Sequence, residues 1–578
     1  MRDAIWEYQT CDDGRVRELV ECLDLHPVVA RLLCQRGLDT PDAASRFLNP
    51  SLDHLHDPFE LTDMSIAIER LQRALARQER IVIHGDYDVD GITSTVILRR
   101  ALEMLGGNVT HFIPERLRDG YGLQVSTIER LENEGARVVV SVDCGIRAGE
   151  AGRRARELGL DLIITDHHEP GDELPQAVAV INPKRRDCGY PEKNLAGVGV
   201  ALKVVQALCA KADRNQWLPG FVKIAAIGTL ADVVPLVGEN RVIAKLGLEW
   251  LSTGRHSVGL RALLEATGLL GKKLEGFHVG FVIAPRLNAA GRMSTPDVAM
   301  RLLMVSDESG ADEARQLAEQ LNVENAKRQE EEAGVLLEAR RLVDADQAGA
   351  PQNVIVVGGE GWHRGVIGIV ASRLVDHFCR PALVFSLEDG VAHGSCRSVA
   401  AFNLLAGLDA CSDLFDRYGG HRQAAGITMA AAGLEELRER INRYADERLS
   451  VDDFRPRLRI DAALSWRSID QRLIEGLSRL GPFGAGNPKP IFSSEQVAVV
   501  RGPRAIKDRH LRMSLGQDGR IFQAMAWRAI DRSAFLDTHR AALDVAYSIE
   551  ESEYRGERYL ELHLADAKRP DEPQPLSA

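Results

Sequence analysis

Three carboxylates and an imidazole crowd a short stretch of this 578-residue chain. The β-branched run at residues 81–83 predicts a buried strand, and residues 93–105 predict a helix. The side chains between or beside them that could do chemistry are His84, Asp86, Asp88 and Asp90. Carboxylates this close repel one another, so some would stay protonated unless a cation lies among them. Oxygen ligands with one imidazole suit Mg²⁺ or Mn²⁺ better than Zn²⁺ or copper.

Two other interpretations of this stretch are a calcium-binding loop and a solvated acidic turn. Asp-x-Asp-x-Asp-Gly also begins the calcium loop of an EF-hand, which needs a helix on each side and a bidentate Glu at its twelfth position. Counted from Asp86, that position holds Ile97, and a strand precedes the loop. The second alternative is a solvated acidic turn, which would not explain why the same pattern recurs downstream.

The pattern of an apolar strand ending in polar chemistry occurs twice more. Residues 137–142 end at Asp143, and residues 161–165 end at a second polar group: Asp166, His167 and His168. Ligands of open α/β sheets bind at the carboxyl ends of parallel strands, so these side chains are expected to meet. Asp232 stands in the apolar stretch 228–236, where a lone Asp would more often be a cap. Beside the other groups, a ligand role for Asp232 is favoured.

Composition describes a globular protein of several domains, with 45% hydrophobic and 27% charged residues. The nine Cys form no CxxC pair, which argues against a zinc ribbon, and no run approaches a membrane span. The start lacks a signal-peptide pattern, so the cytoplasm is expected, with no membrane partner. The net charge is −12, yet residues 497–532 hold eight Lys/Arg against three Asp. This local excess favours a basic groove.

The order of predicted elements indicates an α/β fold with a parallel-sheet catalytic domain and a C-terminal β-barrel. The expected parts are a helical lead-in (1–60), the catalytic domain (61–305), a connector helix (306–350), a second α/β domain (351–450), an antiparallel barrel of the OB type (455–567) and a disordered tail (568–578). The long helix could instead form a coiled-coil dimer, but its heptads are not sustained, and a monomer is expected.

Two smaller patterns have structural alternatives. Gly-x-Gly at 197–199 has Leu202 where a dinucleotide fingerprint has its third Gly, so a tight turn into a helix is favoured. In the barrel, Phe522, Trp527 and Tyr547 are interleaved with basic residues. They could be stacking platforms for the bases of a single strand, or they could be barrel core.

The spacing His84-x-x-x-Asp88-x-Asp90, followed by Asp143, residues 166–168 and Asp232, is similar to the DHH phosphoesterase superfamily. The longer stretches resemble the RecJ family, single-strand-specific DNA exonucleases, from about Leu38 to the C-terminal region. These stretches are HGDYDVDG (84–91), APRLNAAGRM (284–293), GSCRS (394–398) and GGHRQAAG (419–426). The resemblance implies that the second α/β domain is DHH-associated and holds the substrate strand.

The resemblance also implies two-metal hydrolysis of single-stranded DNA in the 5′→3′ direction, releasing 5′-mononucleotides in DNA repair and recombination. Two Mn²⁺ or Mg²⁺ ions are expected, with Asp143 bridging them. The expected ligands are His84, Asp88, Asp90, Asp143, His167 and Asp232. His168 would hydrogen-bond the scissile phosphate, and Asp86 and Asp166 would orient ligands.

A directional enzyme also needs a pocket that reads the strand end. The candidates are Arg286, Arg292, Ser395, Arg397 and His421. The alternative is that Arg286 and Arg397 form internal salt bridges. Single-strand-binding protein and a RecQ-like helicase are expected as partners by family only. Rival functions are a pyrophosphatase, a cyclic-dinucleotide or nanoRNA phosphodiesterase, and a non-catalytic DNA-binding scaffold.

Overall fold

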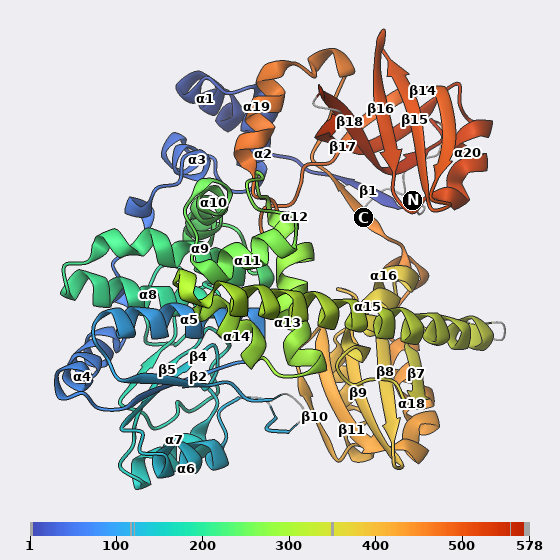
Figure 1. The fold of residues 1–578 in the computed structure, drawn as a ribbon. Helices are drawn as coiled ribbons and strands as arrows, with labels where there is room; N and C mark the ends of the chain where they lie inside the picture. The colour runs from blue at the N-terminus through green and yellow to red at the C-terminus, as the bar shows by residue number, and fades with distance from the viewer. Residues whose placement is uncertain (1–3, 116–117, 121, 348–351, 555–556, 571–578) are drawn as a thin grey trace. The chain divides into compact units, whose positions relative to one another are not determined.

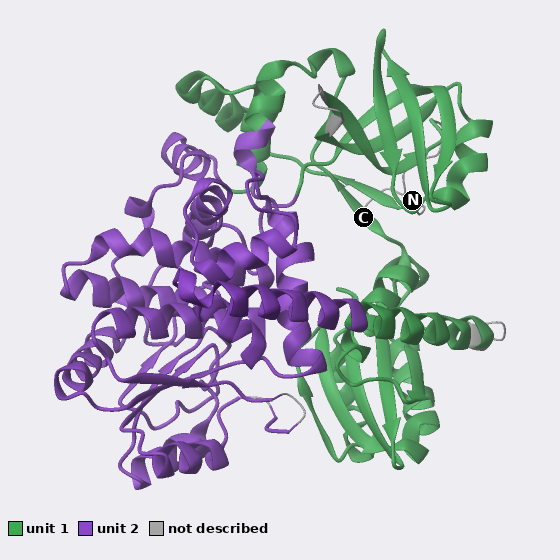
Figure 2. Cartoon of the chain, in the orientation of Figure 1, with its two compact units in different colours: residues 1–37, 328–476, 489–578 green, residues 38–327, 477–488 purple. Residues whose placement is uncertain are grey.

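The computed structural model describes residues 4–115, 118–120, 122–347, 352–554 and 557–570. These residues form two compact units (Figure 2). One unit comprises residues 38–327 and 477–488, and the other comprises residues 1–37, 328–476 and 489–578. From residue 571 on, the predicted tail lies outside the described residues. Among the helices described, none is long and apolar enough to cross a membrane.

Unit 2, which is purple in Figure 2, is built on a sheet of five parallel strands, which confirms the predicted fold class. The strand order is β3-β2-β4-β5-β6. The strands are β2 (Ile81–Gly85), β3 (Val109–Phe112), β4 (Val138–Val142), β5 (Asp161–Thr165) and β6 (Ala179–Ile181). The strands β2 and β4 are buried along their whole length, as expected of a parallel sheet covered on both faces.

Helices cover both faces of this sheet (Figure 1). Alternate residues of β2 enter different cores: Ile81 and Ile83 pack with α5 and α8, whereas Val82 packs with α6 and α7. The helices around the sheet are α4 (Met64–Arg77), α5 (Val89–Met104), α6 (Val125–Asn133), α7 (Gly149–Glu157) and α8 (Gly197–Lys211). The carboxyl ends of the strands therefore lie between helix layers.

A run of helices follows the sheet. Its members are α9 (Leu218–Ala231), α10 (Gly238–Thr253), α11 (Val258–Ala266), α12 (Gly276–His278), α13 (Ala284–Met293), α14 (Asp297–Met304) and α15 (Ala311–Gln347). Between α12 and α13, residues Val279–Ile283 form a π-helical turn. The helix α15 has 37 residues and continues from one compact unit into the other.

Unit 1, which is green in Figure 2, contains another α/β sheet of order β10-β11-β9-β8-β7, in which only β7 and β8 are parallel. Its strands are β7 (Ile355–Glu360), β8 (Ala382–Glu388), β9 (Val391–Arg397), β10 (Arg417–Gly420) and β11 (Ala424–Ala430). The helix α16 (Ile367–Phe378) packs on one face and α18 (Leu434–Asp446) on the other, so each helix contributes to a separate apolar core.

The barrel closes where β14 pairs with both β15 and β17, and it matches the predicted OB type. Its strands are β14 (Phe492–Ile506), β15 (His510–Gln517), β16 (Arg520–Ala526), β17 (Leu543–Tyr554) and β18 (Glu557–Lys568). The expectation of a wholly antiparallel barrel was wrong, because β16 and β18 are parallel. The short helix α20 (Ser533–Thr538) follows β16, so β17 pairs with β14 first and β18 returns beside β16.

The same unit holds the N-terminal elements and the strands leading to the barrel. The strand β1 (Ile5–Tyr8) pairs in parallel with β12 (Arg457–Ile460), and Ile5 lies opposite Arg457. The remaining elements are α1 (Asp13–Leu23), α2 (Pro27–Gln35), α3 (Pro41–Leu48), α17 (Leu404–Asp409), β13 (Ala462–Ala463) and α19 (Gln471–Leu480). Of these, α3 and the last residues of α19, from 477 on, belong to unit 2.

Candidate metal centre

The turn between β2 and α5 is shaped by its acidic residues and by one glycine. Asp88 caps the helix by accepting a hydrogen bond from the Gly91 N–H at 3.1 Å. A side chain at Gly91 would lie 2.5 Å from the carbonyl oxygen of Asp86, so the turn needs glycine there. The helix begins at Val89, four residues before the predicted start, because of this cap. Asp90 therefore projects from the first helical turn.

Asp90 is held by the N-terminus of a second helix. Its two carboxylate oxygens accept hydrogen bonds from the backbone N–H groups of Gly197 and Val198, each at 2.7 Å. These N–H groups open α8 and have no partner inside that helix. A Cβ at Gly197 would lie 2.4 Å from Asp143 Oδ1, so only glycine leaves room for that carboxylate. The Gly-x-Gly pattern at 197–199 was the sequence signal for the role of Gly197, but from the sequence this pattern predicted only a turn.

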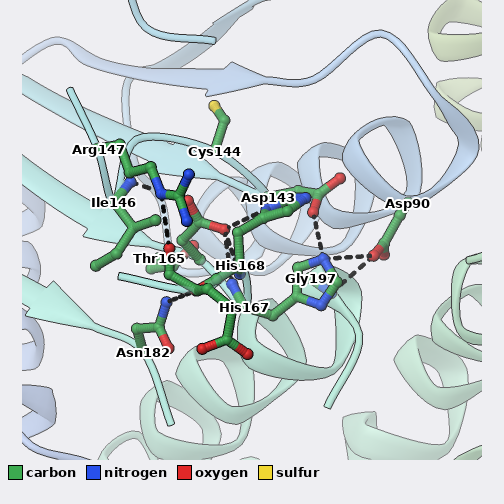
Figure 3. A network of polar contacts seen from close by, with 12 residues as sticks. Asp90, Asp143, Cys144, Ile146, Arg147, Thr165, His167, His168, Asn182 and Gly197 are labelled. Carbon is green, nitrogen blue, oxygen red and sulfur yellow. Dashed lines mark hydrogen bonds and ion pairs between the residues drawn. The ribbon is translucent and has the colours of Figure 1, made fainter. Parts of the chain in front are cut away.

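Asp143 follows β4 in a left-handed conformation with φ of 60°, which Asp tolerates better than most residues. Its buried Oδ1 makes no hydrogen bond within the described part of the chain. The His167 Nε2 atom lies 3.2 Å from this oxygen and 4.0 Å from Asp90 Oδ2 (Figure 3). It also lies 3.8 Å from Asp232 Oδ2. One imidazole nitrogen thus faces three carboxylates from three separate segments.

The protonation of His167 makes this arrangement suited to a cation. Its Nδ1 lies 3.1 Å from the carbonyl oxygen of Leu195, which can only accept, so Nδ1 carries the proton. Burial, with a contribution from His168, lowers the pKa of His167 to about 4, so the ring is neutral at pH 7. The Nε2 lone pair then points at carboxylate oxygens. These groups repel unless a metal ion lies between them.

Three overlapping sets of side chains bring possible ligand atoms within 4.8 Å of one another. They are Asp143 with His167 and His168, Asp90 with His167 and Asp232, and Asp86 with Asp88 and Asp143. Every predicted ligand except His84 is included, and Asp143 belongs to two sets. A donor set of carboxylates and imidazole fits hard divalent cations such as Mg²⁺ and Mn²⁺.

His84 is buried on β2 beside these sets. Its Nδ1 lies 3.5 Å from the Cys144 Sγ, and its Nε2 has no hydrogen-bond partner among the described residues. Burial lowers the pKa of His84 to about 4, so its ring is neutral at pH 7 and this nitrogen can serve as a metal ligand. An unpaired buried imidazole nitrogen is costly, and a metal ion would satisfy it.

Asp166 and His168 form a pair next to His167. The Asp166 Oδ1 accepts hydrogen bonds from the His167 N–H at 2.7 Å, the His168 N–H at 3.0 Å and the His168 ring at 2.7 Å. Burial opposes ionisation of Asp166, but the His168 ring and the backbone N–H groups of His168 and Ile146 lower its pKa overall. Burial likewise opposes charging of His168, and the Asp166 carboxylate raises its pKa overall. Asp166 therefore orients both histidines.

The remaining carboxylates are poised to hold protons when no metal is bound. Burial, with the Asp232 and Asp88 charges, raises the pKa of Asp90, and burial with the Asp90 charge raises that of Asp143. Burial and the Asp88 charge raise the pKa of Asp232 to about 7. Each of these groups must lose its proton before it can bind a metal ion.

We expect the affinity of the metal-free protein for Mn²⁺ to rise with pH through pH 7, because the proton on Asp232 competes with the metal below that pH. The same raised pKa means that the metal-free fold loses stability as pH rises through 7. Calorimetry at about pH 6 and about pH 8 should show more protons released per metal at the lower pH. Asp232→Asn should reduce that difference, and a pH-independent affinity would contradict the assignment.

The candidates for reading the strand end fall in both compact units. Arg286 and Arg292 lie on α13, in the same unit as the metal centre. Arg286 donates to the Val282 carbonyl at 2.7 Å and to Asn322 Oδ1 at 2.6 Å. Both acceptors are neutral, so these hydrogen bonds, and not the salt bridge of the alternative interpretation, hold the Arg286 side chain in place.

Ser395, Arg397 and His421 lie in the other unit. Ser395 and Arg397 are on β9, beside the first turn of α16: a Cβ at Gly368 would lie 2.9 Å from Ser395 Oγ and 3.5 Å from Arg397 Nη2. Arg397 donates to the carbonyl of Cys396 at 2.8 Å. A hydroxyl and a guanidinium beside a helix N-terminus make an arrangement that suits an anion.

The barrel carries a basic surface. Seven of the eight basic residues at 497–532 are exposed, Arg532 being the intermediate one. Arg504 and Arg512 are directly opposite on β14 and β15, where like charges destabilise a sheet unless an anion binds. Of the three aromatics, Phe522 and Tyr547 are core, whereas Trp527 is 52% exposed. The core interpretation therefore holds for two of them.

Comparisons with known proteins agree with this arrangement. Family models match in three places: the N-terminal domain of the DHH family at residues 80–229, the DHHA1 domain at 351–447 and the RecJ OB domain at 460–566. The single-stranded-DNA-specific exonuclease RecJ of Bacillus subtilis is 42% identical over 88% of this chain and 64% of its own length. The protein of that name from Escherichia coli is 33% identical over 95% of this chain and 97% of its own.

Solved structures give the same result. RecJ from Thermus thermophilus in complex with Mn²⁺ superimposes with a TM-score of 0.85, at 32% identity over 99% of this chain and 81% of that one. The Mg²⁺ complex from the same organism has a TM-score of 0.78, at 29% identity over 98% of this chain and 79% of that one. Both relatives hold ions of the type that suits the acidic cluster described above.

Proposed function

Because the chain belongs to the RecJ family of single-stranded-DNA-specific exonucleases, we propose that it degrades single-stranded DNA from the 5′ end. Hydrolysis with two divalent cations would release 5′-mononucleotides during DNA repair and recombination. The observation that carries the proposal is that the set of Asp143, His167 and His168 shares Asp143 with one further set of possible ligands and His167 with another. The ions would be Mn²⁺ or Mg²⁺.

The residues that would hold the ions are His84, Asp88, Asp90, Asp143, His167 and Asp232. All except His84 have a possible ligand atom close to those of two other residues, and His84 has a buried ring nitrogen with no hydrogen-bond partner among the described residues. Asp143 belongs to two of the three sets, which supports its role as the bridge. When bound, two divalent cations supply Lewis acidity, which lowers the pKa of the attacking water and offsets charge on the phosphoryl oxygens. The chain itself holds Asp90 with helix N–H groups, and it holds His167 in one tautomer through Leu195.

His168 would hydrogen-bond the scissile phosphate. Its ring has a raised pKa through the Asp166 carboxylate and is partly exposed, so it can offer a charged N–H to an anion. Asp166 and Asp86 would orient these groups rather than bind metal as their main role. The leaving group would be the 3′ oxygen of the terminal nucleotide.

Direction would come from Ser395 and Arg397, which would bind the 5′ phosphate beside the first turn of α16. His421 would contact the strand closer to the scissile group, and Arg286 and Arg292 would be further contacts to the strand end. The barrel would hold the downstream strand through its phosphates, and the opposed Arg504 and Arg512 support this assignment. Single-strand-binding protein and a RecQ-like helicase stay proposals by family, as do the monomeric state and the cytoplasmic location.

Single strands labelled at either end test the proposal directly. With Mn²⁺ or Mg²⁺, the 5′ label should be released first, as a mononucleotide, and EDTA should prevent release. A matched duplex should be cut slowly. Release of the 3′ label first would contradict the direction, and hydrolysis only of pyrophosphate or of cyclic dinucleotides would favour the rival phosphoesterases.

Arg397→Ala should remove a preference for strands that carry a 5′ phosphate. A hydrogen bond to a charged group contributes about 1.5–3 kcal/mol, so kcat/KM on the 5′-phosphorylated strand should fall by roughly 10- to 100-fold. The rate on the 5′-hydroxyl strand should hardly change. Arg443→Ala is the control, since Arg443 is exposed on α18, which packs on the opposite face of the sheet from α16. Equal losses on both strands would make Arg397 structural.

A further inference from the structure

The backbone directly after Asp232 is strained. Asp232 is the C-cap of α9, and its N–H donates to the Gly228 carbonyl at 2.9 Å. The next residue, Val233, has φ of 61° and is 69% exposed. A β-branched residue avoids this left-handed region, and such strain persists only where the surroundings impose it. Since the Val233 side chain is mostly exposed, its own packing does not impose this conformation, whereas the backbone on both sides of it is held.

The turn at residues 233–236 is held by contacts with a segment almost 250 positions downstream. The Leu236 N–H donates to the Ala485 carbonyl at 2.7 Å. Gly484 and Gly486 approach the turn so closely that added Cβ atoms would lie 2.8 Å from Leu236 Cδ1 and 2.9 Å from Pro235 Cβ. Leu236 is buried by this contact, so the turn at 233–236 has one fixed path.

The gripping segment, residues 477–488, is itself held rigid. Asn487 is buried, and its side-chain amide donates to the carbonyls of Leu480 at 2.9 Å and Pro482 at 2.8 Å. The Gly484 N–H donates to the Asn487 carbonyl at 2.9 Å, which closes the loop. These hydrogen bonds to backbone carbonyls fix the path of the segment, so its conformation does not depend on side-chain packing alone.

Arg241 ties the segment to the helix after the turn. This buried arginine is on α10, and it donates at 3.0–3.1 Å to three successive carbonyls of the segment: those of Arg479, Leu480 and Gly481. Its Nε donates to the Phe47 carbonyl at 2.7 Å. A guanidinium with several acceptors in fixed directions holds a loop more rigidly than a lysine would.

We propose that residues 477–488, the clasp segment, position Asp232 for metal binding by holding the strained turn at 233–236. The clasp segment belongs to the compact unit of the metal centre, although the chain on either side of it belongs to the other unit (Figure 2). The proposal rests on the proposed function only in counting Asp232 among the ligands. A truncation that removed the barrel from residue 455 on would remove the clasp segment too, so its loss of cleavage would not report on the barrel alone.

Gly486→Ala tests the clasp. The new Cβ would press on Pro235, while Gly268→Ala is a matched control: Gly268 has φ of 66° against 68° for Gly486, and no atom lies within 4 Å of its added Cβ. Both variants carry the same backbone strain, so only Gly486→Ala should disturb Asp232. We expect its affinity for Mn²⁺, measured by calorimetry without DNA, to fall by about 10- to 100-fold, as for other residues that orient metal ligands.

Three further readings separate a positioning role from a general loss of stability. Gly486→Ala should lower kcat with KM for the strand unchanged, excess Mn²⁺ should restore part of kcat, and melting temperatures of the two variants should agree. Asn487→Ala should weaken Mn²⁺ binding in the same way. Metal affinities of Gly486→Ala and Asn487→Ala equal to that of Gly268→Ala would overturn the proposal. If these variants bind Mn²⁺ more weakly but the wild-type protein cleaves no single strand, the positioning role of the clasp segment is supported and the proposed function is refuted.

Discussion

Replacement of Asp143 by Asn is expected to lower kcat on single-stranded DNA by about three orders of magnitude or more, because several kcal/mol of charge stabilisation depends on the bridged ions. Asp143 lies in two of the three ligand sets, and its buried Oδ1 has no hydrogen-bond partner within the described residues. The amide has the same shape but no charge, so packing is kept. Loss of activity then reports on metal binding.

Asp172→Asn is the matched control for this variant. Asp172 follows β5 on the same edge of the sheet as the metal centre, but its side chain is fully exposed. Single-strand binding should survive in both variants, because the basic surface lies in the barrel. Full activity of Asp143→Asn with Mn²⁺ would rule out the assignment of the metal centre.

Replacement of Gly197 by Ala is expected to lower kcat by about two orders of magnitude, the upper range for groups that orient metal ligands. The added Cβ would lie 2.4 Å from Asp143 Oδ1 and 2.7 Å from Asp143 Cβ, so the bridging carboxylate would have to move. The Gly197 N–H also holds Asp90. One methyl group therefore disturbs two ligands without removing any charge.

Gly149→Ala controls for the change from glycine to alanine at the start of a helix. Gly149 opens α7 of the same sheet, and nothing lies within 4 Å of its added Cβ. We expect wild-type cleavage and metal affinity from that control. Cleavage by Gly197→Ala at the wild-type rate would show that Asp143 can shift freely, and the proposed close packing around the metal centre would be wrong.

The sequence by itself determined which side chains meet in the candidate metal centre. Each of three apolar runs ends in Asp or His, and parallel strands bring their carboxyl ends to one edge of a sheet. Because strand periodicity and the βαβ order are local signals, this edge could be predicted without knowing the packing. The predicted barrel followed from strand spacing in the same way, apart from the parallel pair of β16 and β18.

Only the tertiary structure decided how those side chains are held. Asp90 is bound by the N-terminus of α8, His167 is fixed in one tautomer by Leu195, and Asp143 fits because Gly197 has no side chain. These partners lie between 28 and 107 residues away from the groups they hold. The clasp segment is farther still from Asp232. Contacts over such distances are set by how helices and loops pack, and no local pattern of residue types specifies which backbone N–H or carbonyl will meet a given side chain.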